Sequence, residues 1–259
     1  EVTTGAFDEF IRHSITKMSN YHFVSNINYK RRVNQLGENP SNIFNVGSLA
    51  IDGILKMKFL KKDELKKNLK IHLDNPFFLI TYQPLSMYPK LSEKEFNILL
   101  KSLISFKKFD LIFTFPNIDI GSDKIINKLF KYKKKYKNIF VFKSLGHLRY
   151  ISLAKFASAI IGNSSSGIIE LPFLGLPIIN IGSRQDGRSK DPNIINLKKI
   201  SHNKLKNNLR WVIKNEKKIF TNSFRNNFYG RGNTAKKIIK IFKKKIFKDN
   251  KYKEFFDYN

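Results

Sequence analysis

Cysteine is absent from the 259-residue chain, and tryptophan occurs once. The lack of thiols excludes disulfide frameworks, zinc sites built from thiolates and cysteine nucleophiles. Long apolar runs are missing as well. No stretch approaches the roughly eighteen uncharged residues that a membrane helix needs, and the first residues lack the pattern of a signal peptide. With 41% hydrophobic residues, the composition predicts a globular, cytoplasmic protein that does not bind membranes.

Acidic residues are scarce: 20 Asp and Glu stand against 49 Lys and Arg, for a formal net charge of +29. Such an excess favours nucleic acid, anionic membranes or phosphorylated ligands as partners. Lysine clusters at 131–137 and 243–245 nevertheless fall between apolar helical positions, as on a solvated helix face. Since no groove of aromatic residues and arginines accompanies them, nucleic acid is not an expected partner. A basic nucleic-acid binder stays an alternative, which salt-dependent retention of DNA would support.

Short apolar runs alternate with amphipathic stretches through the middle of the chain. The expected strands are residues 77–82, 111–115, 139–142, 159–161 and 177–181. The expected helices are residues 93–106, 122–136, 148–156, 167–174 and 203–215. Strands that are apolar throughout and alternate with helices predict a doubly wound α/β domain, whose parallel sheet is covered on both faces.

The two ends of the chain have a different organisation. Residues 1–50 combine a helix (7–18), a strand (21–25) and a second helix, which predicts the end of an N-terminal Rossmann-like domain. Residues 51–233 predict a complete C-terminal Rossmann-like domain, reached through a linker near 48–55 and a lysine-rich helical stretch at 56–69. Residues 234–259 predict a terminal helix (234–247) and a tail. Because the chain does not begin with Met and is dense in motifs from the start, we expect a fragment of a longer protein.

The clearest local signal is IIGNSSSGIIE at 160–170, an apolar strand that breaks into a Ser/Gly turn and opens a helix. At the carboxyl edge of a parallel sheet, such a turn offers free backbone N–H groups and the positive end of a helix dipole to phosphates. Serine hydroxyls add donors, and Glu170 is placed to accept from ribose hydroxyls. An ordinary helix N-cap needs only one serine and no glycine, so the pattern favours a nucleotide site.

Two further loops follow expected strands. The loop NIGSRQDGR at 180–188 brings two arginines, which are good ligands for phosphate oxygens, although a plain surface loop explains them equally well. The loop FPNIDIGS at 115–122 contains Asn117 and could be merely a turn. His147 and His72 have no expected role, because lone histidines are more often packed or solvated.

Charged residues crowd the start of the chain, at Glu1, Asp8, Glu9, Arg12 and His13. On a helix, Asp8 and Arg12 share a face, as do Glu9 and His13. The carboxylates could serve as acid and base, or they could simply suit the positive end of the helix dipole. The pattern alone leaves both interpretations open.

Four ordered blocks together resemble the hydrolysing UDP-N-acetylglucosamine 2-epimerase family of sialic-acid and legionaminic-acid-type biosynthesis. They are EVTTGAFDEFIRHSITKM at 1–18, PNID at 116–119, GNSSSGIIE at 162–170 and NIGSRQDGR at 180–188, and the similarity continues to YGRGN at 229–233. The resemblance implies a glycosyltransferase-B-like fold, with UDP gripped by the C-terminal domain and the sugar in the interdomain cleft. It implies neither a cofactor nor a metal, and the sequence has no evident cluster of metal ligands.

The resemblance also implies residue roles in binding the diphosphate. Ser164, Ser165 and Arg184 would hold it, with Gly167 in the same turn. One position departs from the family, which has His-Pro after the strand that here ends in Gln83-Pro84. Gln83 would therefore replace a diphosphate-contacting histidine with a donor that carries no charge at neutral pH.

The remaining implied roles concern the sugar, the ribose and the proton transfers. Glu170 would bind the ribose and Asn117 would line the nucleotide or sugar pocket. Asp8 matches a carboxylate of the family that is proposed to transfer protons. Glu1 adjoins the family's other acidic group, and we expect both Asp8 and Glu1 to be catalytic.

The resemblance therefore implies an enzyme, homodimeric as members of the family often are, that acts on UDP-N-acetylglucosamine or UDP-N,N'-diacetylbacillosamine. UDP would leave by elimination, and water would then add to give the free sugar epimerised at C2. The chain by itself is not expected to be catalytically active, because the N-terminal part of the first domain would contribute further site residues. Two alternatives remain open: a non-hydrolysing epimerase, which returns a UDP-sugar, and a glycosyltransferase-B-type UDP-sugar-binding protein without epimerase activity.

Overall fold

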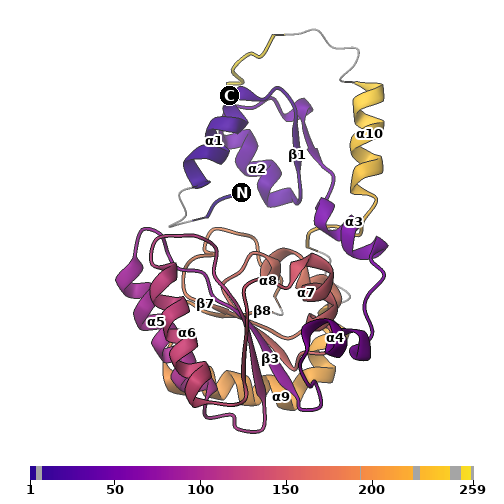
Figure 1. Ribbon diagram of the computed structural model, residues 1–259. Helices are drawn as coiled ribbons and strands as arrows, with labels where there is room; N and C mark the ends of the chain where they lie inside the picture. The colour runs from indigo at the N-terminus through magenta and orange to yellow at the C-terminus, as the bar shows by residue number, and fades with distance from the viewer. Residues whose placement is uncertain (4–7, 193, 224–227, 246–251, 258–259) are drawn as a thin grey trace.

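The computed structural model describes residues 1–3, 8–192, 194–223, 228–245 and 252–257. Two lobes of unequal size lie one above the other (Figure 1). The larger lobe, from α4 to α9, holds a six-stranded sheet, and the smaller lobe holds a two-stranded sheet. Within the described residues, every helix is too short or too polar to cross a lipid bilayer.

The sheet of the larger lobe has the order β5-β4-β3-β6-β7-β8, and all neighbouring strands are parallel. Its strands are β3 (Phe77–Thr81), β4 (Asp110–Thr114), β5 (Ile139–Phe142), β6 (Ala159–Gly162), β7 (Ile178–Ile181) and β8 (Ile194–Leu197). The chain order reverses between β3 and β6, and α/β folds bind ligands at the carboxyl edge of such a reversal. Thr81 and Gly162 are paired in register there, so the loops after β3 and β6 start side by side.

Helices cover both faces of this sheet (Figure 1). They are α4 (Lys62–Leu69), α5 (Pro89–Leu103), α6 (Ser122–Lys135), α7 (Gly146–Ala154), α8 (Ser166–Ile169) and α9 (His202–Ser223). Along β3, Phe77 and Leu79 belong to the core shared with α4, α7 and α8, whereas Phe78 and Ile80 belong to the core shared with α5, α6 and α9. Because both faces are buried, the central strands are apolar throughout, as predicted.

The smaller lobe is built from α1 (Asp8–Met18), β1 (His22–Val24), α2 (Ile27–Gln35), the 3-10 turn η1 (Pro40–Asn42) and β2 (Ile43–Asn45). Strands β1 and β2 pair in parallel with Phe23 opposite Phe44. The terminal helix α10 (Thr234–Lys244) returns to this lobe, where Phe242 stacks on Phe23 with ring centroids 5.6 Å apart. Helix α10 therefore packs against the smaller lobe through Phe242 and also contacts α3 (Leu49–Lys56).

The segment predicted as a linker is a helix, α3 (Leu49–Lys56), which lies between the lobes (Figure 1). Ile51 and Ile54 of α3 are buried. Its Asp52 carboxylate accepts the first free N–H groups of α10, from Thr234 at 3.0 Å and from Ala235 at 2.9 Å. The connection between the lobes is thus a packed helix, α3, and its Asp52 side chain caps the start of α10.

Several predicted boundaries differ from the structure. The helix expected at 167–174 is split into α8 and the 3-10 turn η2 (Leu171–Leu174), because Pro172 lacks the N–H that a continuous helix would need. The helix expected at 203–215 continues to Ser223 beyond a non-helical residue, Asn215. In the 56–69 stretch only α4 is helical, and the helix expected at 234–247 ends at Lys244. The prediction for residues 246 and 247 falls outside the described residues.

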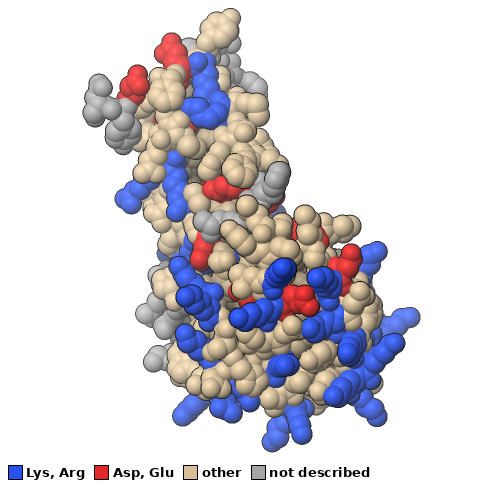
Figure 2. Space-filling model, turned by 90° about the vertical axis from the view of Figure 1, so that its left-hand side faces the viewer, with Lys and Arg blue, Asp and Glu red and all other residues tan. Residues whose placement is uncertain are grey.

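The lysines of the two clusters face solvent, except Lys245, which is half-buried and donates to the carbonyl of Ser41 at 2.6 Å. All five lysines of 131–137 are exposed, whereas Tyr132 and Tyr136 between them are half-buried. Figure 2 shows Lys and Arg side chains around the visible edge of the larger lobe. The pattern on these helices is that of a solvated face, as the spacing indicated.

Candidate functional site

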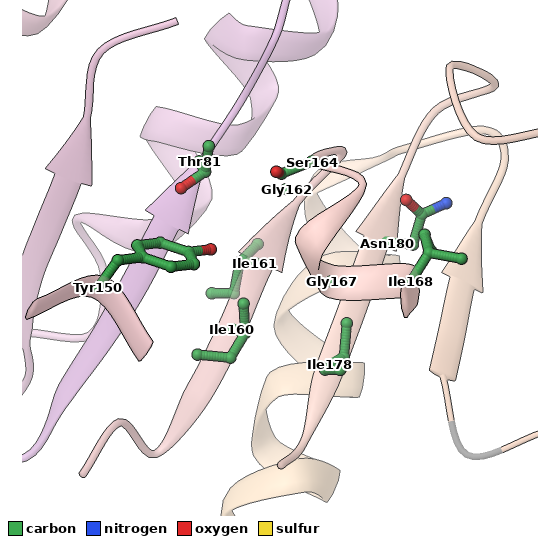
Figure 3. A pocket seen from close by; sticks show the side chains of 10 residues that line it. All are labelled: Thr81, Tyr150, Ile160, Ile161, Gly162, Ser164, Gly167, Ile168, Ile178 and Asn180. Atoms are coloured by element: carbon green, nitrogen blue, oxygen red, sulfur yellow. The ribbon is translucent and has the colours of Figure 1, made fainter. Parts of the chain in front are cut away.

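A hollow opens at the carboxyl edge of the sheet between β3 and β6. Its lining comes from β3, α7, β6, the turn after β6, α8 and β7 (Figure 3), and comprises Thr81, Tyr150, Ile160, Ile161, Gly162, Ser164, Gly167, Ile168, Ile178 and Asn180. Isoleucines form its deep part, and the hydroxyl oxygens of Thr81, Tyr150 and Ser164 lie at the same end (Figure 3). The chain reversal of the sheet thus coincides with a concave surface that carries hydrogen-bonding groups.

The serine-rich turn has a backbone that requires glycine at its start. Gly162 has a φ of 142°, and a Cβ there would overlap the carbonyl oxygen of Thr81 on the neighbouring strand. Gly167 donates its N–H to the carbonyl of Ser164 at 3.2 Å, inside the turn. Within the described chain, the backbone N–H groups of Ser164 and Ser165 have no acceptor, so these two amides can donate to a ligand. Since α8 is a single turn, these local donors matter more than a helix dipole.

Asn163, between the glycine and the serines, ties the loops together. Its side chain accepts the N–H of Gln83 at 2.6 Å and donates to the carbonyl of Gln83 at 2.8 Å. Its own carbonyl accepts from Gln185 at 2.7 Å and from Arg184 at 3.3 Å. Asn163 is 1% exposed, and these bonds fix the loops after β3, β6 and β7 relative to one another.

Gln83 also uses its side chain within the protein. Its Oε1 accepts the backbone N–H of Asn117 at 2.7 Å, and the carbonyl of Asn117 accepts from the hydroxyl of Ser122 at 2.5 Å. The Asn117 side chain itself is exposed at the carboxyl edge of β4. Gln83 therefore holds the loop after β4 in place with its carbonyl oxygen, which leaves its NH₂ group as the remaining donor.

Arg184 follows β7 and lies partly buried beside the serine turn. Burial lowers the pKa of its guanidinium, an effect that the charges of Asp119 and Asp8 oppose. Arginine stays charged at any working pH even so. A cation that is partly stripped of water, next to free amide donors, is a favourable place for a phosphate.

Charged groups of the smaller lobe reach this edge. Arg188, on the same loop as Arg184, donates to the Glu1 carboxylate at 2.7 Å and to Gln185 at 2.6 Å. In α1, Arg12 lies 3.8 Å from the Asp8 carboxylate and 3.0 Å from that of Glu9. The Asp8 side chain is 72% exposed. The Glu1 carboxylate is therefore held by Arg188, whereas the Asp8 carboxylate faces solvent.

Glu170 has a partner that the sequence did not predict. Its Oε1 lies 2.9 Å from Nε2 of His147, at the start of α7. The Glu170 side chain is 19% exposed and that of His147 is 55% exposed, so the pair lies at the rim. Among the described residues, no three His, Asp or Glu side chains gather closely enough to hold a metal ion.

Comparison with known proteins supplies the family. The family described as UDP-N-acetylglucosamine 2-epimerase matches residues 1–243. The chain belongs to this family. The chain is 49% identical over 196 residues to a GDP/UDP-N,N'-diacetylbacillosamine 2-epimerase (hydrolyzing) of Campylobacter jejuni, an alignment that covers 75% of this chain and 51% of that protein. It is 36% identical to the polysialic acid biosynthesis protein P7 of Escherichia coli, over 99% of this chain and 65% of that protein.

Solved structures of the family share the fold. The structure of UDP-GlcNAc 2-epimerase from Neisseria meningitidis bound to UDP-GlcNAc aligns with a TM-score of 0.74 at 17% identity, covering 93% of this chain and 66% of that one. The glycosyltransferase-B-like α/β fold predicted from the sequence is confirmed. In both comparisons this chain spans about half to two thirds of the length of its relatives.

The structure brings most of the predicted site residues of this epimerase-family chain to one edge of the larger lobe. Ser164, Ser165, Gly167 and Glu170 lie on the turn and on α8, and Gln83, Asn117 and Arg184 lie on the three loops beside it. Asp8 and Glu1 reach the same edge from the smaller lobe.

Sequence reasoning missed Asn163, Gln185 and Tyr150 as parts of the site. Asn163 could have been found, because a polar residue directly after a buried strand must find hydrogen-bond partners. Gln185 and Tyr150 had no comparable signal, since their contacts depend on how the loops and α7 meet in space.

Proposed function

We propose that the full-length protein is a hydrolysing 2-epimerase of UDP-N-acetylglucosamine or UDP-N,N'-diacetylbacillosamine. The observation that carries the proposal is the serine turn at the chain reversal, with two free amides, next to the partly buried Arg184. Membership of the epimerase family and 49% identity to a hydrolysing relative support it. The larger lobe would belong to a nucleotide-binding domain of residues 51–233, and the smaller lobe to the end of a catalytic domain.

The nucleotide would be held by the larger lobe. Ser164, Ser165 and Arg184 would donate to the diphosphate, and Gly167 would let α8 pack closely behind them. Gln83 would contribute the free end of its amide. When UDP leaves, its diphosphate takes the bonding electron pair and gains negative charge. Hydrogen-bond donors on loops that Asn163 already holds in place would stabilise this charge without reorganising.

The rest of the site would handle ribose, sugar and protons. Glu170 would accept from a ribose hydroxyl after releasing His147, and Asn117 would line the pocket. A carboxylate from the smaller lobe, Asp8 or Glu1, would remove the proton at C2 while the C1–O bond to UDP breaks, which leaves a glycal. Water would then add across the double bond, its hydroxyl to C1 and its proton to C2 on the opposite face.

Product analysis tests this proposal. The full-length protein is incubated with each UDP-sugar, and products are followed by proton NMR. The proposal expects UDP together with a free 2-epimeric sugar. A 2-epimeric UDP-sugar without UDP release would assign the non-hydrolysing reaction instead, and neither product from either substrate would sink the assignment.

One observation favours a second candidate function. Gln83, which carries neither charge nor transferable proton, occupies a position at which the resemblance implied a histidine, and its amide carbonyl is already bonded to Asn117. The alternative is a UDP-sugar-binding protein without turnover. It expects calorimetric binding of the UDP-sugar with no product over long incubation.

We also propose that the protein acts as a cytoplasmic homodimer, without nucleic acid or membrane as a partner. Nucleotide sugars are phosphorylated, so the positive charge of the chain suits them as ligands. Light scattering of the full-length protein measures its mass in solution, and a monomer at micromolar concentration would contradict the dimer.

A further inference from the structure

A chain of hydroxyl groups runs beneath the serine turn. The Tyr150 oxygen lies 3.1 Å from Oγ of Ser166, and Ser166 Oγ lies 3.0 Å from Oγ of Ser164. On the other side of Tyr150, the Thr81 side chain also lines the hollow, and Thr81 Oγ1 lies 2.8 Å from Oγ1 of Thr114. Tyr150 of α7, Ser166 of α8 and Ser164 of the turn are thereby linked through side-chain oxygens, and Tyr150 and Ser164 line the hollow (Figure 3).

The direction of these bonds follows from counting donors. A hydroxyl has one hydrogen to donate and two lone pairs to accept. Ser164 Oγ already accepts the backbone N–H of Ser166 at 3.4 Å. If Ser166 also donates its hydroxyl to Ser164, both lone pairs of Ser164 are used, and its own hydrogen is free to point into the hollow.

Tyr150 decides whether Ser166 donates in that direction. When the phenol donates to Ser166, the Ser166 oxygen acts as acceptor toward Tyr150 and its hydrogen turns toward Ser164. Burial raises the pKa of the Tyr150 phenol, so the phenol keeps its proton at any working pH. Ser166 Oγ lies within hydrogen-bond distance of the phenol, so the phenol can donate its hydrogen to Ser166.

We propose that Tyr150 is a positioning residue, which acts through Ser166 to present the hydroxyl hydrogen of Ser164 to an anionic oxygen of the ligand. The inference rests on the proposed function, because it assigns that oxygen to a diphosphate. Without the phenol, Ser166 can reverse its bond, and Ser164 then turns a lone pair toward the anion. With its lone pair toward the anion, the Ser164 hydroxyl repels the ligand. With its hydrogen already toward the anion, the hydroxyl binds the ligand without having to rotate first.

The test compares two ligands that differ in their phosphates. Affinities of the full-length protein for UDP and for uridine are measured by calorimetry and by ligand-observed NMR. Tyr150→Phe keeps the ring and removes one oxygen, and we expect it to weaken UDP binding about three- to tenfold, as for the loss of one neutral hydrogen bond. Uridine binding and the melting temperature stay unchanged. Tyr132→Phe, at a half-buried position of α6 outside the lining of the hollow, is the matched control and leaves both affinities as they are.

A double-mutant cycle shows whether Tyr150 works through Ser164. In a Ser164→Ala background, Tyr150→Phe should cause no further loss, because the oriented hydroxyl is already gone. Ser166→Ala, which breaks the chain in the middle, should reproduce the selective loss of UDP affinity.

The outcomes separate the two proposals. Unchanged UDP affinity in Tyr150→Phe, an equal loss for uridine, or additive losses in the cycle would each overturn the positioning role. Failure of the unmodified protein to bind UDP at all would overturn the proposed function instead.

Discussion

Arg184 is the cation best placed to meet a phosphate, since it is partly buried and bonded to the carbonyl of Asn163 at 3.3 Å. Arg184→Ala should weaken UDP binding by about 1.5 to 3 kcal/mol, the usual worth of a hydrogen bond to a charged group. Calorimetry with UDP measures the loss. Arg210→Ala, which removes an exposed arginine of α9, is the matched control, and equal affinities in the two variants would remove Arg184 from the site.

Asn163 supports the site without facing the ligand. Asn163→Asp keeps its shape, but it replaces the NH₂ donor to the Gln83 carbonyl by an oxygen, inside a position that is 1% exposed. We expect a loss of about 2 to 4 kcal/mol in the free energy of unfolding, because a buried acceptor is left unpaired beside a carboxylate. Urea denaturation measures it. The exposed Asn127→Asp of α6 adds the same charge and should change stability by less than about 0.5 kcal/mol; similar values for both variants would contradict this role.

The glycines and serines of the turn could be predicted individually, since each has a local reason. Gly162 needs a backbone that only glycine adopts easily, and Ser164 follows a buried strand. The partnership of Glu170 with His147 could not be predicted, because the two residues come from different helices and meet only after folding.

Helix α10 depends on a cap that comes from another helix. Its own N-cap residue, Asn233, has a φ of 59° and makes no side-chain cap bond, and Asp52 of α3 accepts the free N–H groups instead. Burial by itself would raise the pKa of Asp52, but the N–H groups of Ala235 and Thr234 outweigh it, and the pKa is lowered. The carboxylate is therefore the form that the folded protein stabilises.

Asp52→Asn should cost about 1 to 2 kcal/mol at neutral pH, because one of the two N–H groups would face an NH₂ donor. A lowered pKa contributes stability above the value in the unfolded chain, about 3.9, and that stability is lost as the pH falls through the folded value. The difference between the two proteins should thus shrink below about pH 4. Urea denaturation at neutral and acid pH measures it, with the exposed Asp63→Asn of α4 as control. A difference that stays constant with pH would show that the charge has no part in the cap.

The central elements were predictable and the marginal ones were not. Strands β3, β4, β6 and β7 are buried on both faces, so their apolar runs stand out in the sequence. Strand β5 lies at the sheet edge with only Ile139 buried, but its four residues are all apolar. Strand β8 carries Asn196 and lies at the sheet edge, and β2 has three residues; neither has enough burial to leave a pattern. The linker was predicted near 48–55 because a lysine-rich polar stretch follows it, whereas the packing of α3 against α10 is set by tertiary contacts.

The two lobes meet through polar contacts on both sides of the candidate site. Tyr29 of α2 shares a hydrogen bond of 3.0 Å with Tyr229, and Arg32 donates to the carbonyl of Gly187. With Glu1 on Arg188, these bonds hold α2 and the first residue of the chain against the loop after β7. These contacts fit the proposed division of labour, in which the larger lobe would bind the nucleotide and the smaller lobe would supply proton transfer.

Asp8→Asn tests this division. The change keeps the shape of the side chain and removes its ability to take a proton, so turnover should fall by about 10²- to 10⁴-fold, as for the loss of a general base. UDP affinity should stay within about threefold, because Asp8 is 72% exposed and, in the proposed function, the other lobe would hold the nucleotide. Initial rates of UDP release and calorimetry with UDP, on the full-length protein, give the two quantities.

Asp63→Asn, an exposed aspartate of α4 in the larger lobe, is the control and should alter neither quantity. The two readouts distinguish the possible roles of Asp8. A loss of affinity that matches the loss of rate would make Asp8 a binding residue, since binding and catalysis would then depend on the same contact. Unchanged turnover would leave Glu1, held by Arg188 at the lobe contact, as the acidic group to test next. The split between rate and affinity therefore decides whether the smaller lobe is the catalytic half of this edge.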